Sequence, residues 1–199
     1  SLFMPVNRSV PDVAEKRKNW NGLISGFKAS DLVFLDESGC NTDMTRRYAY
    51  SLGGSRAVDS APLSKPKNTT ILSSIQLDGT LHYTTFSGGT TVERFKQYLK
   101  TDLLPHLNGD SVLVMDNMKS HHAKAVKNLL DSSGVRYIYL PPYSPDLNPI
   151  EKLWSKVKSL LRKFKARTLD ALPNAIQNAF HSITVSDCSG WFRFCGYVL

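Results

Sequence analysis

The sequence predicts one α/β domain on a mixed five-stranded sheet, three antiparallel strands followed by parallel crossovers, with helices on both faces. Early apolar runs are short, and two of them flank Asp78-Gly79, a dipeptide typical of two-residue hairpins because both turn positions require positive φ. Later apolar runs alternate with helical periodicity, and strand–helix–strand connections give parallel pairing. With 41% hydrophobic residues among 199, the chain can bury a substantial core.

The first half of the chain is predicted as one helix followed by strands. Apolar runs of strand length, bounded by turn residues, identify the strands, and a loop rich in polar residues and proline separates the second strand from the hairpin. The expected elements are a helix over 12–25, strands over 31–36, 46–52, 71–77 and 80–86, and a loop over 59–68.

The second half is predicted to alternate helices and strands. Thr90-Thr91-Val92-Glu93 predicts a capping box that opens a helix running to about Leu107. The segment 141–149 contains four prolines and is therefore expected to be a stiff loop. The remaining elements are strands over 111–116 and 135–140 and helices over 121–132, 149–165 and 168–182. Residues 1–28 are assigned to a linker and N-terminal helix, and 29–199 to the domain.

Composition narrows the class of protein. Lys and Arg number 25 against 17 Asp and Glu, a net charge of +8, and basic surface attracts nucleic-acid phosphate without a sequence code. The three cysteines, Cys40, Cys188 and Cys195, contain no Cys-x-x-Cys pair, which argues against a zinc site or a disulfide framework and favours a reducing compartment. No apolar run approaches the ~18 residues of a transmembrane helix, so no membrane partner is expected.

Three acids mark a candidate site. Asp36 and Asp116 each end an apolar strand-like run, where α/β folds place ligands, and Glu151 opens the helix after the proline-rich loop. Carboxylates gathered in one crevice need a hard cation such as Mg²⁺, and two such ions about 4 Å apart catalyse phosphoryl transfer. Each aspartate is about as well explained as a turn former, and Glu151 as the third residue of a capping box with Asn148 as N-cap.

Basic residues follow Glu151 along its helix. On a helical wheel, Lys158, Arg162 and Lys165 lie on the side of Glu151, beside the apolar arc that packs on the sheet. Taken alone, this pattern is typical of a solvated helix face. Next to three convergent acids, a track that contacts the phosphate backbone becomes the better interpretation.

Several motifs resemble the catalytic domain of mariner-type transposases and, most closely, the related bacterial insertion-sequence transposases. They are Asp36-Glu37-Ser38-Gly39, Asp116-Asn117 followed by His121, and YSPDLNPIEKLW at 143–154. Between Asp116 and Glu151 lie 34 residues, the spacing typical of the Asp-Asp-Glu triad of that superfamily. The resemblance extends over roughly residues 10–196.

This resemblance implies an RNase H-like fold with Mg²⁺ or Mn²⁺, two per active site, held by Asp36, Asp116 and Glu151. It implies hydrolytic cutting at transposon ends, after which the freed 3′-hydroxyl attacks target double-stranded DNA, usually at TA. It also implies a homodimer on the DNA and a cytoplasmic, nucleoid-associated location in a bacterium. Family members normally carry helix-turn-helix modules ahead of this domain, so we expect an isolated catalytic domain, a fragment or the second half of a split reading frame.

Further residues carry weaker predictions. His121 and its neighbour Asn117 are candidates for supporting the site, with DNA contact as an alternative role for His121. Tyr143, Lys65 and Lys67 are candidate DNA contacts, although loop packing or an ordinary solvated loop explains them as well. Trp154 is expected in the core. Two functional alternatives remain: a non-catalytic DNA-binding or assembly protein that keeps the fold, and another RNase H-like nuclease, such as one acting on RNA–DNA hybrids.

Overall fold

The computed structural model describes residues 11–41, 68–164, 168 and 170–197, and it contains the predicted mixed sheet. Five strands lie in the order β3-β2-β1-β4-β5. Strands β1 and β2 and strands β2 and β3 pair antiparallel, whereas β4 pairs parallel with both β1 and β5. The strands are β1 (Leu32–Cys40), β2 (Thr69–Ile75), β3 (Leu81–Ser87), β4 (Val112–Met115) and β5 (Arg136–Tyr139).

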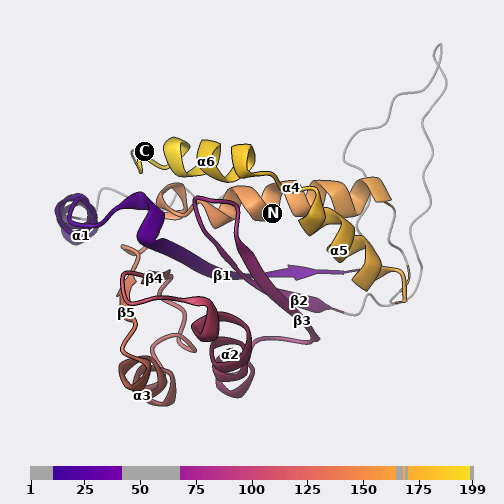
Figure 1. The fold of residues 1–199 in the computed structure, drawn as a ribbon, viewed down its shortest axis with the longest axis horizontal. Helices are drawn as coiled ribbons and strands as arrows, with labels where there is room; N and C mark the ends of the chain where they lie inside the picture. Colours follow the sequence, from indigo (N-terminus) through magenta and orange to yellow (C-terminus); the bar gives the residue numbers. More distant parts are fainter. Residues whose placement is uncertain (1–10, 42–67, 165–167, 169, 198–199) are drawn as a thin grey trace, which may run out of the picture.

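Helices cover both faces of this sheet, as predicted (Figure 1). Helices α4, α5 and α6 lie over one face and α2 and α3 over the other, while α1 stands at one side. The helices are α1 (Pro11–Ile24), α2 (Val92–Tyr98), α3 (Lys124–Ser133), α4 (Ile150–Phe164), α5 (Leu172–His181) and α6 (Val185–Phe194). Within the described ranges, no helix is long and apolar enough to cross a membrane.

The sheet separates two hydrophobic cores because successive strand residues point to opposite faces. In β1, Leu32 and Phe34 belong to the core that includes residues of α4, α5 and α6, whereas Val33 and Leu35 belong to the core that includes residues of α2 and α3. All four are essentially inaccessible to solvent. This two-sided burial explains why the first strand reads as a continuous apolar run.

The prediction that the first strand ends at Asp36 was wrong. Strand β1 continues to Cys40 because β2 pairs antiparallel with it from Phe34 to Cys40, and these ladder bonds hold the polar sequence in the strand. On the other side, parallel pairing stops at Leu35, opposite Met115. The following residues, Asp36 and Asp116, are therefore neighbours even though only Asp116 follows the end of its strand.

Helix boundaries also differ from the prediction. Thr91, not Thr90, caps α2, and its hydroxyl accepts from the Arg94 amide at 3.3 Å, so the predicted capping box with Glu93 is not formed. Helix α3 begins at Lys124 rather than residue 121, because turns in which His121 and His122 donate to the Met118 carbonyl precede it. Helix α6 was not predicted. The predicted strand at 46–52 and the loop at 59–67 lie outside the described residues.

Candidate active site

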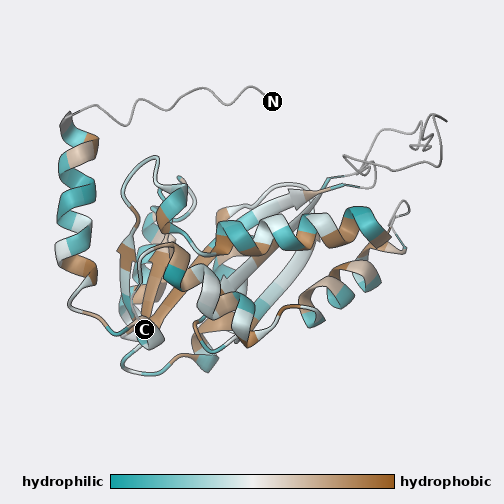
Figure 2. Ribbon diagram, turned by 90° about the horizontal axis from the view of Figure 1, so that it is seen from above, coloured by the Kyte–Doolittle hydropathy of each residue, from teal (hydrophilic) through white to brown (hydrophobic). Residues whose placement is uncertain are grey.

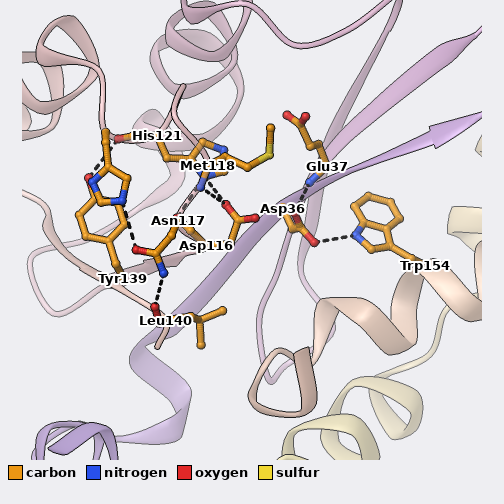
Figure 3. A network of polar contacts seen from close by, with 10 residues as sticks. Asp36, Glu37, Asp116, Asn117, Met118, His121, Tyr139, Leu140 and Trp154 are labelled. Atoms are coloured by element: carbon orange, nitrogen blue, oxygen red, sulfur yellow. Dashed lines mark hydrogen bonds and ion pairs between the residues drawn. The ribbon is translucent and has the colours of Figure 1, made fainter. Parts of the chain in front are cut away.

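Three segments distant in the sequence bring Asp36, Asp116 and Glu151 to one cavity of about 470 Å³. The parallel register of β1 and β4 places the two aspartates side by side (Figure 3). Glu151 comes from the first turn of α4. The other lining residues are Asn117, Met118, Leu140, Pro141, Pro142, Tyr143, Ser144, Pro145 and Asn148. The proline-rich loop thus forms one wall of the cavity.

Asp36 is held firmly at the base of this cavity, where it is 7% exposed. The Glu37 amide donates to its Oδ1 at 2.7 Å, and the Trp154 indole N–H donates to its Oδ2 at 3.3 Å. Burial raises the pKa of Asp36 to about 7; the charges of Asp116 and Glu151 act in the same direction, and the two hydrogen bonds oppose them. A cation beside Asp36 would offset the free-energy cost of keeping its buried carboxylate charged.

Asp116 has the opposite electrostatic environment. The fully buried His121 places its Nδ1 2.7 Å from Asp116 Oδ1, and the Met118 amide donates to the same oxygen at 3.0 Å. Partial burial acts to raise the pKa of Asp116, but these hydrogen bonds and the attraction of His121 outweigh it and lower the pKa below its ordinary value. Asp116 is therefore ionised at neutral pH.

His121 is locked in place by its surroundings. Its ring stacks on Phe95 of α2 with centroids 4.4 Å apart, and Tyr139 donates its hydroxyl to the His121 carbonyl at 3.0 Å. Because its side chain is inaccessible to solvent, His121 cannot contact DNA, and the alternative of a DNA contact was wrong. The geometry instead lets His121 orient Asp116.

Glu151 does not form the capping box that sequence reasoning left open. The Asn148 amide, which such a box would offer to Glu151, donates to the Pro145 carbonyl at 3.1 Å. Among the described residues, the buried Asn148 Oδ1 has no hydrogen-bond partner. Glu151 is accessible from the cavity, yet desolvation by neighbouring atoms raises its pKa; Lys158 opposes this shift and repulsion from Asp116 adds to it.

The other candidates fall into three groups. Lys158 lies close enough to Glu151 to influence its pKa, and Arg162 lies one turn further along α4, both partly buried. Tyr143 lines the cavity with its side chain 63% exposed, and its φ of 55° lies in the left-handed region that non-glycine residues rarely adopt. Lys65, Lys67 and Lys165 lie outside the described residues.

Asn117 supports the loop beside the aspartates, and Trp154 contacts Asp36 directly. Asn117 Nδ2 donates to the Leu140 carbonyl at 2.5 Å and so ties the end of β4 to the start of the proline-rich loop. Trp154 is in the core, as predicted, at 4% exposed, but its indole also holds Asp36, a role that sequence reasoning missed. The available signal was its position three residues after Glu151, on the edge of the apolar arc next to the site.

The donor set fits a hard divalent cation. The cavity lining supplies three carboxylates together with amide and hydroxyl oxygens, and it includes no cysteine or histidine among the described residues. Within the described part of the chain, no three acidic, histidine or cysteine side chains are already close enough to form a metal site. Asp36 and Asp116 are fixed by hydrogen bonds to their neighbours, whereas Glu151 is the accessible member of the three.

Comparison with known proteins agrees with this geometry. The family model for the DDE superfamily endonuclease matches residues 31–173, which include all three acids. The Tc1 transposable-element transposase of Caenorhabditis elegans is 30% identical over 92 residues, which are 46% of this chain and 34% of that protein. The chain therefore spans about a third of the length of this curated relative.

Solved structures share the fold. The Mos1 transposase paired-end complex with the left transposon end gives a TM-score of 0.79 at 19% identity, covering 97% of this chain and 61% of that chain. The catalytic domain of Mos1 mariner transposase gives 0.74 at 16% identity, covering 99% and 94%. A Mos1 paired-end complex with Mg has the same TM-score of 0.74, at 17% identity over 98% of this chain and 61% of that chain.

Proposed function

The chain belongs to the DDE superfamily endonucleases, as a mariner-superfamily transposase catalytic domain, and we propose that its cavity cleaves DNA strands at transposon ends and joins them to target DNA. The observation that supports this most strongly is the convergence of three carboxylates from β1, the end of β4 and the start of α4 on one cavity. The matched family, DDE superfamily endonucleases, performs phosphodiester chemistry, and the oxygen donor set suits it.

We propose that Asp36, Asp116 and Glu151 hold two divalent ions, Mg²⁺ or Mn²⁺. When bound, the metal would activate the attacking oxygen and stabilise the leaving one. The two aspartates are presented by neighbours that restrict their movement, namely Trp154 and the Glu37 amide for Asp36 and His121 for Asp116. Preorganisation of this kind limits the cost of assembling the site. Glu151 is the accessible side chain and would complete the ligand set by moving inward.

The proposed substrate is double-stranded DNA at transposon ends and at a TA target. Tyr143, exposed beside the acids, would stack on or contact the DNA, and Lys158 and Arg162 would contact phosphates along α4. Lys65, Lys67 and Lys165 stay predicted DNA contacts. A homodimer would bring two transposon ends together, and the expected location, the bacterial nucleoid, stays a prediction as well.

A plasmid-nicking assay tests this function. Wild-type protein, Glu151→Gln and the control Glu93→Gln are incubated with supercoiled plasmid, with and without Mn²⁺, after their folding is checked by circular dichroism. Glu93 is a matched control because it is also an exposed glutamate in the first turn of a helix, α2, but it lies outside the cavity. We expect Mn²⁺-dependent nicking by wild type and Glu93→Gln and a loss of at least about a hundredfold in Glu151→Gln. Equal nicking by all three proteins would contradict the catalytic role of Glu151.

A further inference from the structure

Helix α1 meets the rest of the protein through one narrow face. Its buried side chains, Val13 and Trp20, are 6% and 3% exposed, and they lie seven residues apart, so they share a face. Arg17 falls between them on that same face, four residues after Val13 and three before Trp20. Much of the remaining surface of α1 is hydrophilic and open to solvent (Figure 2). The one long charged side chain on the inward face therefore needs an explanation.

Arg17 reaches across to the proline-rich loop of the active site. Its Nη1 donates to Ser144 Oγ at 2.7 Å and to Asp146 Oδ1 at 3.1 Å, and its Nη2 donates to Asp146 Oδ2 at 2.6 Å. The guanidinium is partly buried, and the hydrogen bonds and charge of Asp146 raise the pKa of Arg17 despite desolvation. A forked contact of this kind fixes orientation as well as distance, which a lysine ammonium cannot reproduce.

Ser144 and Asp146, which Arg17 binds, lie in the loop between Tyr143 and Glu151. Ser144, 5% exposed, follows Tyr143, whose left-handed backbone must be held by its surroundings. Ser144 Oγ also donates to the Pro142 carbonyl at 3.1 Å, and the Ser144 carbonyl accepts from Leu147 at 3.1 Å. The loop then leads directly to the start of α4 and Glu151. Fixing Ser144 and Asp146 therefore fixes the wall of the cavity and the approach to its third acid.

We propose that Arg17 is a positioning residue for the active site, acting through the proline-rich loop. This proposal rests on the proposed function and deepens it, because it makes α1 part of the catalytic unit. Helix α1 lies entirely before residue 31, where the matched family region begins. The sequence predicts residues 1–28 as a linker and N-terminal helix ahead of the domain, whereas Arg17 makes this helix a brace whose docking determines the shape of the cavity wall.

The first test is amide hydrogen exchange in the loop, which requires no activity. The Leu147 and Asn148 amides donate within the loop, to Ser144 and Pro145, so their exchange reports its opening. In Arg17→Ala, we expect both amides to exchange about tenfold faster or more. The control Lys16→Ala removes the same charge from the same helix, but Lys16 pairs with Asp12 of α1, so exchange should match wild type. Equal exchange in Arg17→Ala and Lys16→Ala would overturn the proposal.

The second test is kinetic. In the plasmid assay, we expect Arg17→Ala to lower the rate at saturating DNA about tenfold or more, and Arg17→Lys to recover only part of it. The losses in Arg17→Ala and Ser144→Ala should be less than additive in the double variant, since both changes break the same Arg17–Ser144 hydrogen bond. Fully additive losses of rate in the double variant, or a wild-type rate in Arg17→Lys, would overturn the proposal. If wild type does not nick at all, the proposed function fails, while the exchange measurement still decides whether Arg17 holds the loop.

Discussion

Asp36 is a buried carboxylate beside two further acids, and its surroundings disfavour its charged form. Its pKa is raised to about 7. Trp154 and the Glu37 amide nevertheless hold both of its oxygens, so the protein keeps this carboxylate in place at an electrostatic cost. Acidic side chains with strongly shifted pKa values are found most often at functional sites.

The pH dependence of stability follows from that shift. The folded-state pKa of Asp36 exceeds its ordinary value of 3.8, so its contribution to stability is fully present below about pH 4 and is lost as the pH rises through about 7. Relative to Asp36→Asn, we expect the metal-free wild type to lose up to about 4 kcal/mol of unfolding free energy between pH 4 and pH 8. Urea unfolding of both proteins across this range measures it. A difference that does not vary with pH would contradict the environment described for Asp36.

The acids could be predicted from sequence, whereas most of their support could not. Asp36 and Asp116 were identified because each follows an apolar run, and Glu151 because it begins a helix after a stiff loop. The contacts of Trp154 with Asp36 and of Arg17 with Ser144 depend on how α4 and α1 pack, and no local pattern encodes such distant pairings. The burial of His121 likewise depends on the position of Phe95 on α2.

Among the α-helices and strands of the described ranges, α6 is the element that the sequence analysis does not predict. Its residues include Gly190 and several polar side chains, so its apolar face is weak. The available signal was Thr184-x-x-Asp187, which forms a capping box in the structure. The box predicted at Thr90 is absent because the helix begins one residue later, at Val92. Capping patterns therefore indicate a helix start to within a residue, and they need support from the apolar pattern.

Asp187 connects α6 to the helix that carries Glu151. Its carboxylate accepts from the Thr184 amide at 2.8 Å and pairs with Lys156 of α4 at 2.5 Å. We expect Asp187→Ala to lower the unfolding free energy by about 1–2 kcal/mol, mainly through the lost cap, while leaving nicking close to wild type. Lys156→Ala, which keeps the cap, should cost less than half as much. Urea unfolding of the two variants compares them, and equal losses would mean that the ion pair, not the cap, dominates.

Across the whole domain, the mixed strand topology is what brings the three acids to one cavity. Parallel pairing of β1 and β4 brings Asp36 beside Asp116, and the crossover through α3 and β5 delivers the proline-rich loop and Glu151 to the same end of the sheet. The Asp78-Gly79 hairpin signal and the later alternation of strands and helices were enough to predict a mixed sheet. The sequence pattern could not show that α1 contacts the proline-rich loop, because that contact joins two segments that lie far apart in the sequence.

Mn²⁺ binding measured by calorimetry at pH 8 tests most directly whether the three carboxylates form one divalent metal site. We expect wild type and Glu93→Gln to bind alike, and Asp36→Asn, Asp116→Asn and Glu151→Gln each to bind about tenfold more weakly or worse. If Glu151→Gln binds Mn²⁺ as tightly as wild type, Glu151 is not a ligand and the three acids do not act together as one site.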